Sequence, residues 1–99
     1  MKLTIEPEWT FTPDWRGNLE LPEEEQVRID MRLLTNRESL GAKGAEDVGA
    51  KAVNAIRNLE INGQVIDTWD KLLDCSLPDL QLQIMQQINQ RAVSDSKNF

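Results

Sequence analysis

The residues that most often carry chemistry are scarce in this chain of 99 residues. It has no histidine and a single cysteine, Cys75, which stands between Asp74 and Ser76. Without histidine, the commonest general base and metal ligand is missing, and neither a Ser-His nor a Cys-His nucleophile pair can form. The acidic neighbour disfavours a thiolate, so we interpret Cys75 as a small buried or half-buried thiol. We therefore expect no enzyme, no catalytic residue and no cofactor.

The carboxylates offer one further candidate, the run Glu23-Glu24-Glu25. Adjacent side chains diverge along an extended chain, whereas the oxygen ligands of a cation must converge. The run is more typical of a solvated acidic guard beside a strand. Gly41-Ala-Lys-Gly44 lacks the spacing of a phosphate-binding loop and is better explained as a helix break. We expect no metal site, and a small enzyme or metal-binding regulator is the least favoured class.

Composition limits the partners and the compartment. The chain has 17 acidic and 11 basic residues, a net charge of −6, and its basic residues form no stripe. An acidic chain of this kind repels phosphate backbones, so we expect no nucleic-acid binding. It has no apolar signal-peptide core and no apolar run of about 20 residues, and one cysteine allows no internal disulfide. We expect a cytoplasmic protein that does not enter a membrane.

The clearest element is a strand predicted over Gln26 to Leu34. Its apolar residues alternate without error with charged ones, which is the pattern of a half-buried strand. The apolar positions are Val27, Ile29, Met31 and Leu33. Thr35 and Glu38 then have the spacing of a capping box, which predicts a short helix ended by the nearby glycines.

The remaining elements are predicted from shorter patterns. Leu3 with Ile5 and Trp9 with Phe11 indicate one or two short strands before a loop from Pro13 to Pro22. Helical spacing predicts a helix over Ala45 to Asn58, and Asn62-Gly63 predicts a two-residue hairpin pairing Leu59 with Ile66. Two helices follow, over Thr68 to Asp74 with Asp67 as cap, and from Ser76 to about Val93.

These elements predict an α+β fold. A small antiparallel sheet, made of the N-terminal strands and the Asn-Gly hairpin, packs against three or four helices. We expect one domain over residues 1–99, with a frayed tail over about 94–99.

Two kinds of surface are candidates for binding another protein. A strand can take a partner strand at its edge, and an apolar helix stripe can take a partner helix. Trp9 and Trp15 could serve as aromatic anchors. Core packing is the favoured alternative for all of these residues, and solvent exposure is favoured for the glutamine-rich side of the last helix. The candidate partner surface comprises Trp9, Trp15, Val27, Ile29, Met31, Leu80, Ile84 and Ile88.

Three short motifs add a family resemblance. They are Phe11-x-Pro13, the run from Asn18 to Val27 (Asn-Leu-Glu-Leu-Pro-Glu-Glu-Glu-Gln-Val), and Leu34-Thr35-x-x-Glu38. With these motifs, the N-terminal third resembles small tail-module proteins of siphophages and prophages. The capped last helix and its polar tail are similar to tail assembly chaperones of that group.

The resemblance implies a non-enzymatic protein that acts while a phage tail is built in the bacterial host. Such chaperones bind the tape measure protein, help to recruit tail tube subunits and tend to self-associate. The family has no catalytic motif to transfer. The strand and the hairpin depart from an all-helical chaperone. A structural virion component, such as a head–tail connector or minor tail protein, is therefore the alternative.

Overall fold

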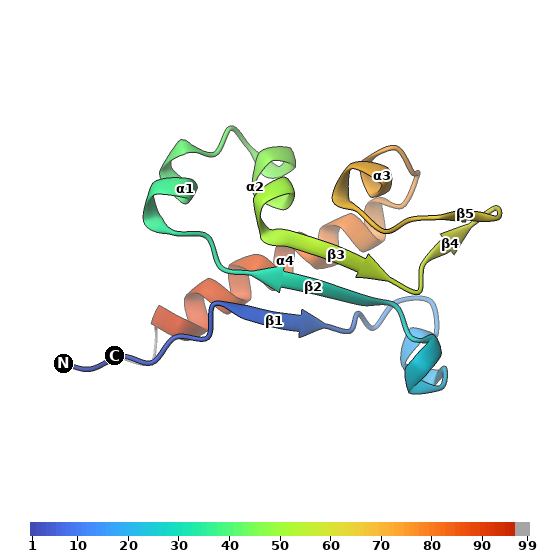
Figure 1. The fold of residues 1–99 in the computed structure, drawn as a ribbon, viewed down its shortest axis with the longest axis horizontal. Coiled ribbons are helices and arrows are strands. Elements are labelled where there is room, and N and C mark those ends of the chain that lie inside the picture. The colour runs from blue at the N-terminus through green and yellow to red at the C-terminus, as the bar shows by residue number, and fades with distance from the viewer. Residues whose placement is uncertain (97–99) are drawn as a thin grey trace.

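The structure, a computed structural model, describes residues 1–96 and has an α+β fold (Figure 1). The strands are β1 (Glu8–Phe11), β2 (Arg28–Arg32), β3 (Val53–Arg57), β4 (Glu60–Ile61) and β5 (Gln64–Val65). The α-helices are α1 (Asn36–Gly41), α2 (Ala45–Ala52), α3 (Trp69–Leu73) and α4 (Pro78–Ser96). Two 3-10 turns, η1 (Asn18–Glu20) and η2 (Glu23–Glu25), precede β2.

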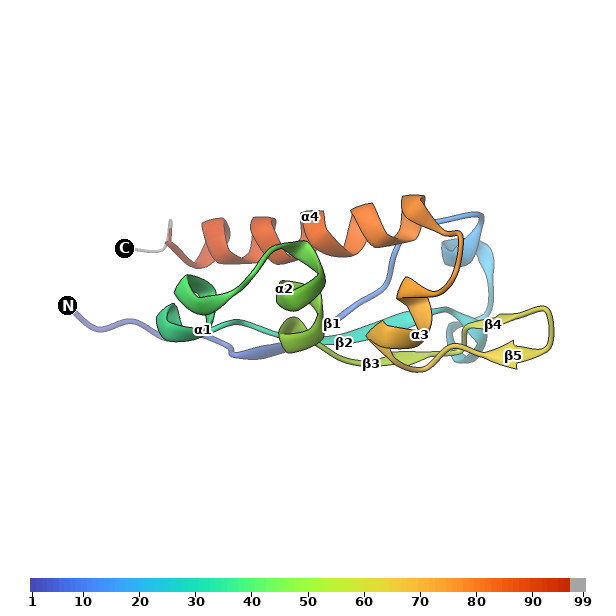
Figure 2. The ribbon, with the colours of Figure 1, turned by 90° about the horizontal axis from the view of Figure 1, so that it is seen from above.

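The first three strands form an antiparallel sheet in the order β1-β2-β3. Helix α4 runs along one face of this sheet, and α2 and α3 lie on the same side as α4, next to β3 (Figure 2). The predicted fold class, a small antiparallel sheet against helices, is therefore confirmed. One solvated face is common in antiparallel sheets, because only the other face needs a partner layer.

Strand β2 is the middle strand and separates the two faces. Its apolar side chains are buried, with Ile29 at 0% and Met31 at 1% exposure. On the opposite face, Asp30 accepts hydrogen bonds from Thr10 Oγ1 of β1 (3.0 Å) and from Arg57 of β3 (2.8 Å). The side chain of Asp30 ties the three strands together.

The predicted alternation of β2 is confirmed over Arg28–Arg32. The strand is, however, shorter than the predicted Gln26 to Leu34. Leu33 lies outside it and is only half-buried.

The predicted helix over Ala45 to Asn58 is wrong in its second half. Helix α2 ends at Ala52, and the chain continues directly as β3. Val53 and Ile56 are both buried, although a regular strand would place residues three apart on opposite faces. The pairing with β2 skips Asn54, so this bulge returns both side chains to the core face. A three-residue spacing typical of a helix is thus produced by an irregular strand.

The predicted Asn-Gly hairpin is confirmed in its turn and its pairing. Asn62 and Gly63 both have positive φ, and Ile61 pairs with Gln64. The backbone N–H of Ile66 donates to the Leu59 carbonyl at 2.9 Å, which extends the hairpin. Strands β4 and β5 form their own two-stranded sheet and do not join the larger one, which instead gains β3.

Of the one or two short strands predicted near the N-terminus, one is present. Trp9 and Phe11 lie on β1, but residues 1–7 form no strand. Leu3 and Ile5 are 44% and 50% exposed. Their alternation is suited to a strand, yet β2 ends at Arg32 and gives this segment little to pair with.

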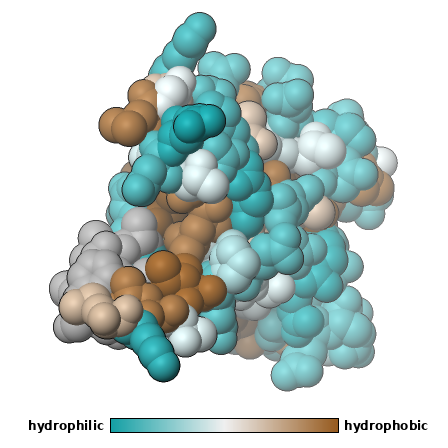
Figure 3. Space-filling view, turned by 60° about the vertical axis from the view of Figure 1, so that its left-hand side comes forward, coloured by the Kyte–Doolittle hydropathy of each residue, from teal (hydrophilic) through white to brown (hydrophobic). Residues whose placement is uncertain are grey.

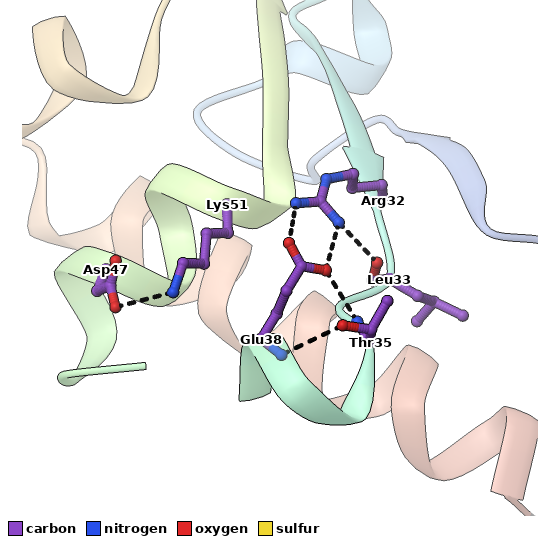
Figure 4. Close-up of polar contacts among 6 residues, drawn as sticks. All are labelled: Arg32, Leu33, Thr35, Glu38, Asp47 and Lys51. Atoms are coloured by element: carbon purple, nitrogen blue, oxygen red, sulfur yellow. Dashed lines mark hydrogen bonds and ion pairs between the residues drawn. The ribbon is translucent and has the colours of Figure 1, made fainter. Parts of the chain in front are cut away.

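The predicted capping box at Thr35 and Glu38 is confirmed (Figure 4). The Glu38 N–H donates to the Thr35 hydroxyl, and the Thr35 N–H donates to the Glu38 carboxylate. The same carboxylate receives two bonds from the Arg32 guanidinium, at 2.9 and 2.5 Å. Helix α3 is capped by Thr68, whose hydroxyl accepts from the Lys71 N–H, and not by the predicted Asp67.

The core lies between the sheet and the helices. Helix α4 supplies its apolar stripe, and Trp69 of α3 is 3% exposed. Gly49 of α2 sits directly against the Trp69 ring, where an added Cβ would lie only 2.1 Å from Cε2. The ring N–H donates to the Glu46 carbonyl at 3.0 Å. Helix α4 continues to Ser96, beyond its predicted end at about Val93, and the rest of the predicted frayed tail lies outside the described residues.

Candidate functional site

Six of the eight candidate partner residues are packed in the core. They share exposures of 9% or less. They are Val27, Ile29 and Met31 of the β2 segment and Leu80, Ile84 and Ile88 of α4. Strand β2 also cannot take a partner strand, because β1 and β3 occupy both of its edges. In the folded chain these residues have the core role that the sequence favoured.

Trp9 and Trp15 are half-buried, and each is held by polar neighbours. The Trp15 ring N–H donates to Asp79 Oδ2 at 2.7 Å, and Arg16 lies 5.1 Å from the Trp15 ring centre. The Arg91 guanidinium lies 5.0 Å from the Trp9 ring centre. Both rings also pack against the core. Trp15 attaches the loop after β1 to the start of α4, and Trp9 attaches β1 itself to the C-terminal half of α4. Neither ring is therefore a freely projecting anchor.

Asn18 is the polar residue that the sequence reasoning overlooked. It is 2% exposed, and its side chain joins two segments before β2. Its amide donates to the carbonyls of Pro13 (2.9 Å) and Val27 (3.1 Å), while its oxygen accepts from the Val27 N–H (2.7 Å). Gln26 donates to the Leu19 and Leu21 carbonyls. A polar residue at a turn next to Gly17 was the available signal, because such turns often need an amide to bond the backbone.

The segment that Asn18 holds exposes apolar side chains. Leu19 and Leu21 are 50% and 44% exposed. The glutamates of η2 are all exposed, and two of them border a depression of about 430 Å³ that reaches the hairpin residue Val65, itself 57% exposed. We call this end of the molecule the loop surface. It consists of Leu19, Leu21, Glu23, Glu24, Glu25, Glu60 and Val65.

The opposite end carries a different exposed segment, residues 1–7, which we call the N-terminal arm. Met1 is 97% exposed, and Leu40 at the end of α1 is 88% exposed. Figure 3, which brings this end forward, shows apolar residues at the surface among hydrophilic ones. Glu6 contacts Arg91 of α4 at 3.3 Å, with the Glu6 side chain 78% exposed. The sequence placed this segment in a strand and so did not identify it as exposed.

Hydrogen bonds and charges lower the pKa of four carboxyl groups. The shifts of Asp47 and Asp67 come mainly from neighbours four residues away, Lys43 and Lys51 for the first and Lys71 for the second. Those of Glu38 and Asp79 come mainly from more distant segments.

Hydrogen bonds from the Arg32 guanidinium and, to a smaller extent, from the Thr35 N–H lower the pKa of Glu38 to about 2. The Trp15 ring N–H, with a smaller contribution from Arg16, lowers the pKa of Asp79. Glu38 joins α1 to β2, and Asp79 joins α4 to the loop after β1. Contacts that hold the fold together therefore account for the lowered pKa values of these two groups, and a catalytic role is not needed to explain them.

Other candidates for chemistry are dispersed. Cys75 is half-buried, as expected, and its thiol donates to the Lys71 carbonyl. Across residues 1–96, no cluster of three or more Cys, Asp or Glu residues is arranged to hold a metal ion. Within the same range, every helix is too short or too polar to span a bilayer. On the glutamine-rich side of α4, Gln86, Asn89 and Gln90 are exposed, while Gln83 donates to the Asp14 carbonyl.

The described residues therefore expose apolar side chains at both ends of the molecule. The loop surface is fixed by internal hydrogen bonds, and the N-terminal arm is open. Comparisons with protein-family models, with curated proteins and with solved structures give no significant match.

Proposed function

We propose that this protein is non-enzymatic and acts by binding other proteins, as a phage tail assembly chaperone in the cytoplasm of the bacterial host. Its partners are the tape measure protein and tail tube subunits. The observation that carries the proposal is the loop surface, where two half-exposed leucines stand among glutamates on a segment held by the buried Asn18. The same segment carries the longest of the motifs that resemble the phage proteins.

The chemistry of the loop surface indicates what it would bind. Covering the exposed halves of Leu19 and Leu21 would contribute roughly 2 kcal/mol in total. Exposed carboxylates around an apolar centre speed association with a positively charged partner and reject an acidic one. The surface thus fits a segment that presents apolar side chains flanked by lysine or arginine. Because Asn18 and Gln26 already fix the backbone, little conformational entropy is lost on binding.

Co-expression tests this proposal directly. The tape measure protein of the same phage or prophage is produced with and without this chain, and its soluble fraction and its co-purification are measured. We expect the wild-type chain to raise the soluble fraction and to co-purify. We expect the double variant Leu19→Ser, Leu21→Ser to lose both effects. Leu82→Ser is the matched control, because Leu82 is 58% exposed but lies on α4.

Two results would contradict the proposal. One is the absence of any interaction in soluble or co-expressed form, and the other is equal loss in the Leu82 control. Mass spectrometry of purified particles distinguishes the chaperone from the alternative, a structural virion component. A chaperone is absent from the finished particle, whereas a head–tail connector or minor tail protein persists in it.

A further inference from the structure

Strand β1 has one edge without a partner strand among the described residues. The Leu33 N–H donates to the Pro7 carbonyl at 2.7 Å, which fixes the phase of the antiparallel ladder. Backbone groups alternate between the two sides of such a strand, so odd-numbered residues bond β2. The N–H and C=O groups of Glu8 and Thr10 therefore point to the open edge, where a further strand would bond them.

The N-terminal arm has the pattern of a strand but no partner. Apolar Met1, Leu3 and Ile5 alternate with polar Lys2, Thr4 and Glu6, and the apolar members are 44% to 97% exposed. An open edge and an unpaired alternating segment thus adjoin in one chain. Within a single copy they cannot pair, because the arm runs directly into β1 without a turn.

We propose that the N-terminal arm of one copy adds to the β1 edge of a second copy, and that the second copy's arm does the same in return. The two segments run antiparallel about a two-fold axis at Ile5. In this register Lys2 stands opposite Glu8 of the second copy, and Thr4 opposite Glu6. The arm therefore pairs with the other arm and with the start of β1, and it does not reach Thr10. On the other face Ile5 meets its own counterpart, Leu3 meets Pro7 and Met1 meets Trp9.

Charge complementarity and contact with β1 together favour this register. Opposite charges on facing residues stabilise a strand pair, and like charges destabilise it. The register above makes the Lys2–Glu8 pair twice, whereas a shift of the axis to residue 6 would set Glu6 against Glu6. An axis at residue 4 would also pair Lys2 with an acidic residue, Glu6, but it would leave β1 without a partner. Pairing would also bury apolar surface on the other face, because Met1 would cover part of the half-buried Trp9 ring.

The rearrangement that pairing requires is small. Glu6 must leave Arg91, a contact at 3.3 Å in which the glutamate is mostly exposed. Surface ion pairs of this kind contribute little. A strand pair of this length buries little area, so we expect a weak, concentration-dependent dimer. Such pairing would occur whether or not the chain binds a tail protein.

Cysteine crosslinking of the full chain tests the register. In a Cys75→Ser background, Ile5→Cys would place two thiols on the axis, where facing Cα atoms lie about 4.5 Å apart, within disulfide range. Leu3→Cys is the matched control, because its two copies would be about 13 Å apart. With oxidised glutathione as oxidant, we expect the Ile5→Cys chain to crosslink at least about tenfold faster.

Charge reversal then tests the pairing itself. In the Ile5→Cys background, Lys2→Glu or Glu8→Lys alone should slow crosslinking about fivefold, because two attractive pairs become repulsive. The double variant Lys2→Glu, Glu8→Lys should restore the rate. Equal crosslinking of the Ile5→Cys and Leu3→Cys chains, or failure of the double variant to recover, would overturn the proposal. Circular dichroism of each variant confirms that it is folded.

Discussion

The two ends of this molecule both expose apolar side chains, but they hold them in different ways. At the loop surface, Asn18 is buried and makes three hydrogen bonds to backbone groups. At the arm end, the polar contacts are charged and only partly buried, such as Glu6 with Arg91 and Glu38 with Arg32. The difference shows that exposure alone does not define a binding surface. The loop surface is preorganised by neutral, buried hydrogen bonds. The other end carries the N-terminal arm, an unpaired segment with few contacts to hold it.

The largest expected effect is at the loop surface. Asn18→Ala leaves the Val27 N–H and two carbonyls without their partner in a buried place, which should cost about 3 kcal/mol of unfolding free energy. Chemical denaturation measures the loss, and hydrogen exchange should show the Val27 amide opening. Asn89→Ala, on the exposed side of α4, is the matched control and should change stability by less than about 0.5 kcal/mol. Equal losses in the two variants would remove the contrast between the ends.

A smaller effect is expected at the arm end, and it should depend on pH. The folded pKa of Glu38 is about 2, below its ordinary value of 4.5. Its stabilising contribution is therefore complete above about pH 4.5 and is lost as the pH falls toward 2. Glu38→Gln should be less stable than wild type at pH 7, and the difference should shrink on acidification. Thermal melts between pH 7 and pH 2 measure this, and a constant difference would contradict it. Neutral bonds at Asn18 do not titrate in this range.

Gln26→Ala should have a modest effect on the loop surface. The Gln26 amide donates to the Leu19 and Leu21 carbonyls at 3.4 and 3.0 Å, but these bonds are exposed and water can replace them. We expect a loss of about 0.5–1 kcal/mol by chemical denaturation, with faster exchange of the η1 amides. A loss as large as that of Asn18→Ala would mean that Asn18 is not the main constraint.

The smallest effect on stability is expected in the N-terminal arm. Leu3→Ser should change the unfolding free energy of the isolated chain by less than about 0.5 kcal/mol, because the side chain is already 44% exposed and lies outside the sheet. Denaturation at low protein concentration measures this. A loss above about 1 kcal/mol would show that the arm is part of the folded core and would end the contrast with the loop surface.

Local patterns predicted much of the fold, and they failed where long-range contacts decide. The alternation of β2, the capping box at Thr35 and the turn at Asn62-Gly63 each depend on near neighbours and were predicted correctly. The bulge at Asn54 depends on pairing with β2, so local spacing alone predicts a helix where β3 lies. Leu3 and Ile5 have a strand pattern, but pairing requires a strand beside them, and none of the described residues provides it.

The candidate partner residues show a related limit. Apolar periodicity finds the residues that leave water, such as Ile29 and Ile84, without telling whether the chain itself covers them. In the structure it does, and their exposures are 0%. The loop surface could not be found in this way, because Leu19 and Leu21 follow no periodic pattern. Their display depends on Asn18, whose role appears only once residues from Pro13 to Val27 are folded together.

The three tryptophans occupy three separate regions of the structure. Trp9 lies next to the N-terminal arm beneath Arg91, Trp15 precedes the loop surface and bonds Asp79, and Trp69 is buried against Gly49. No tyrosine is present in the chain. Its intrinsic fluorescence therefore arises from these three rings, and variants that keep one ring each would give an optical reporter for either end and for the core.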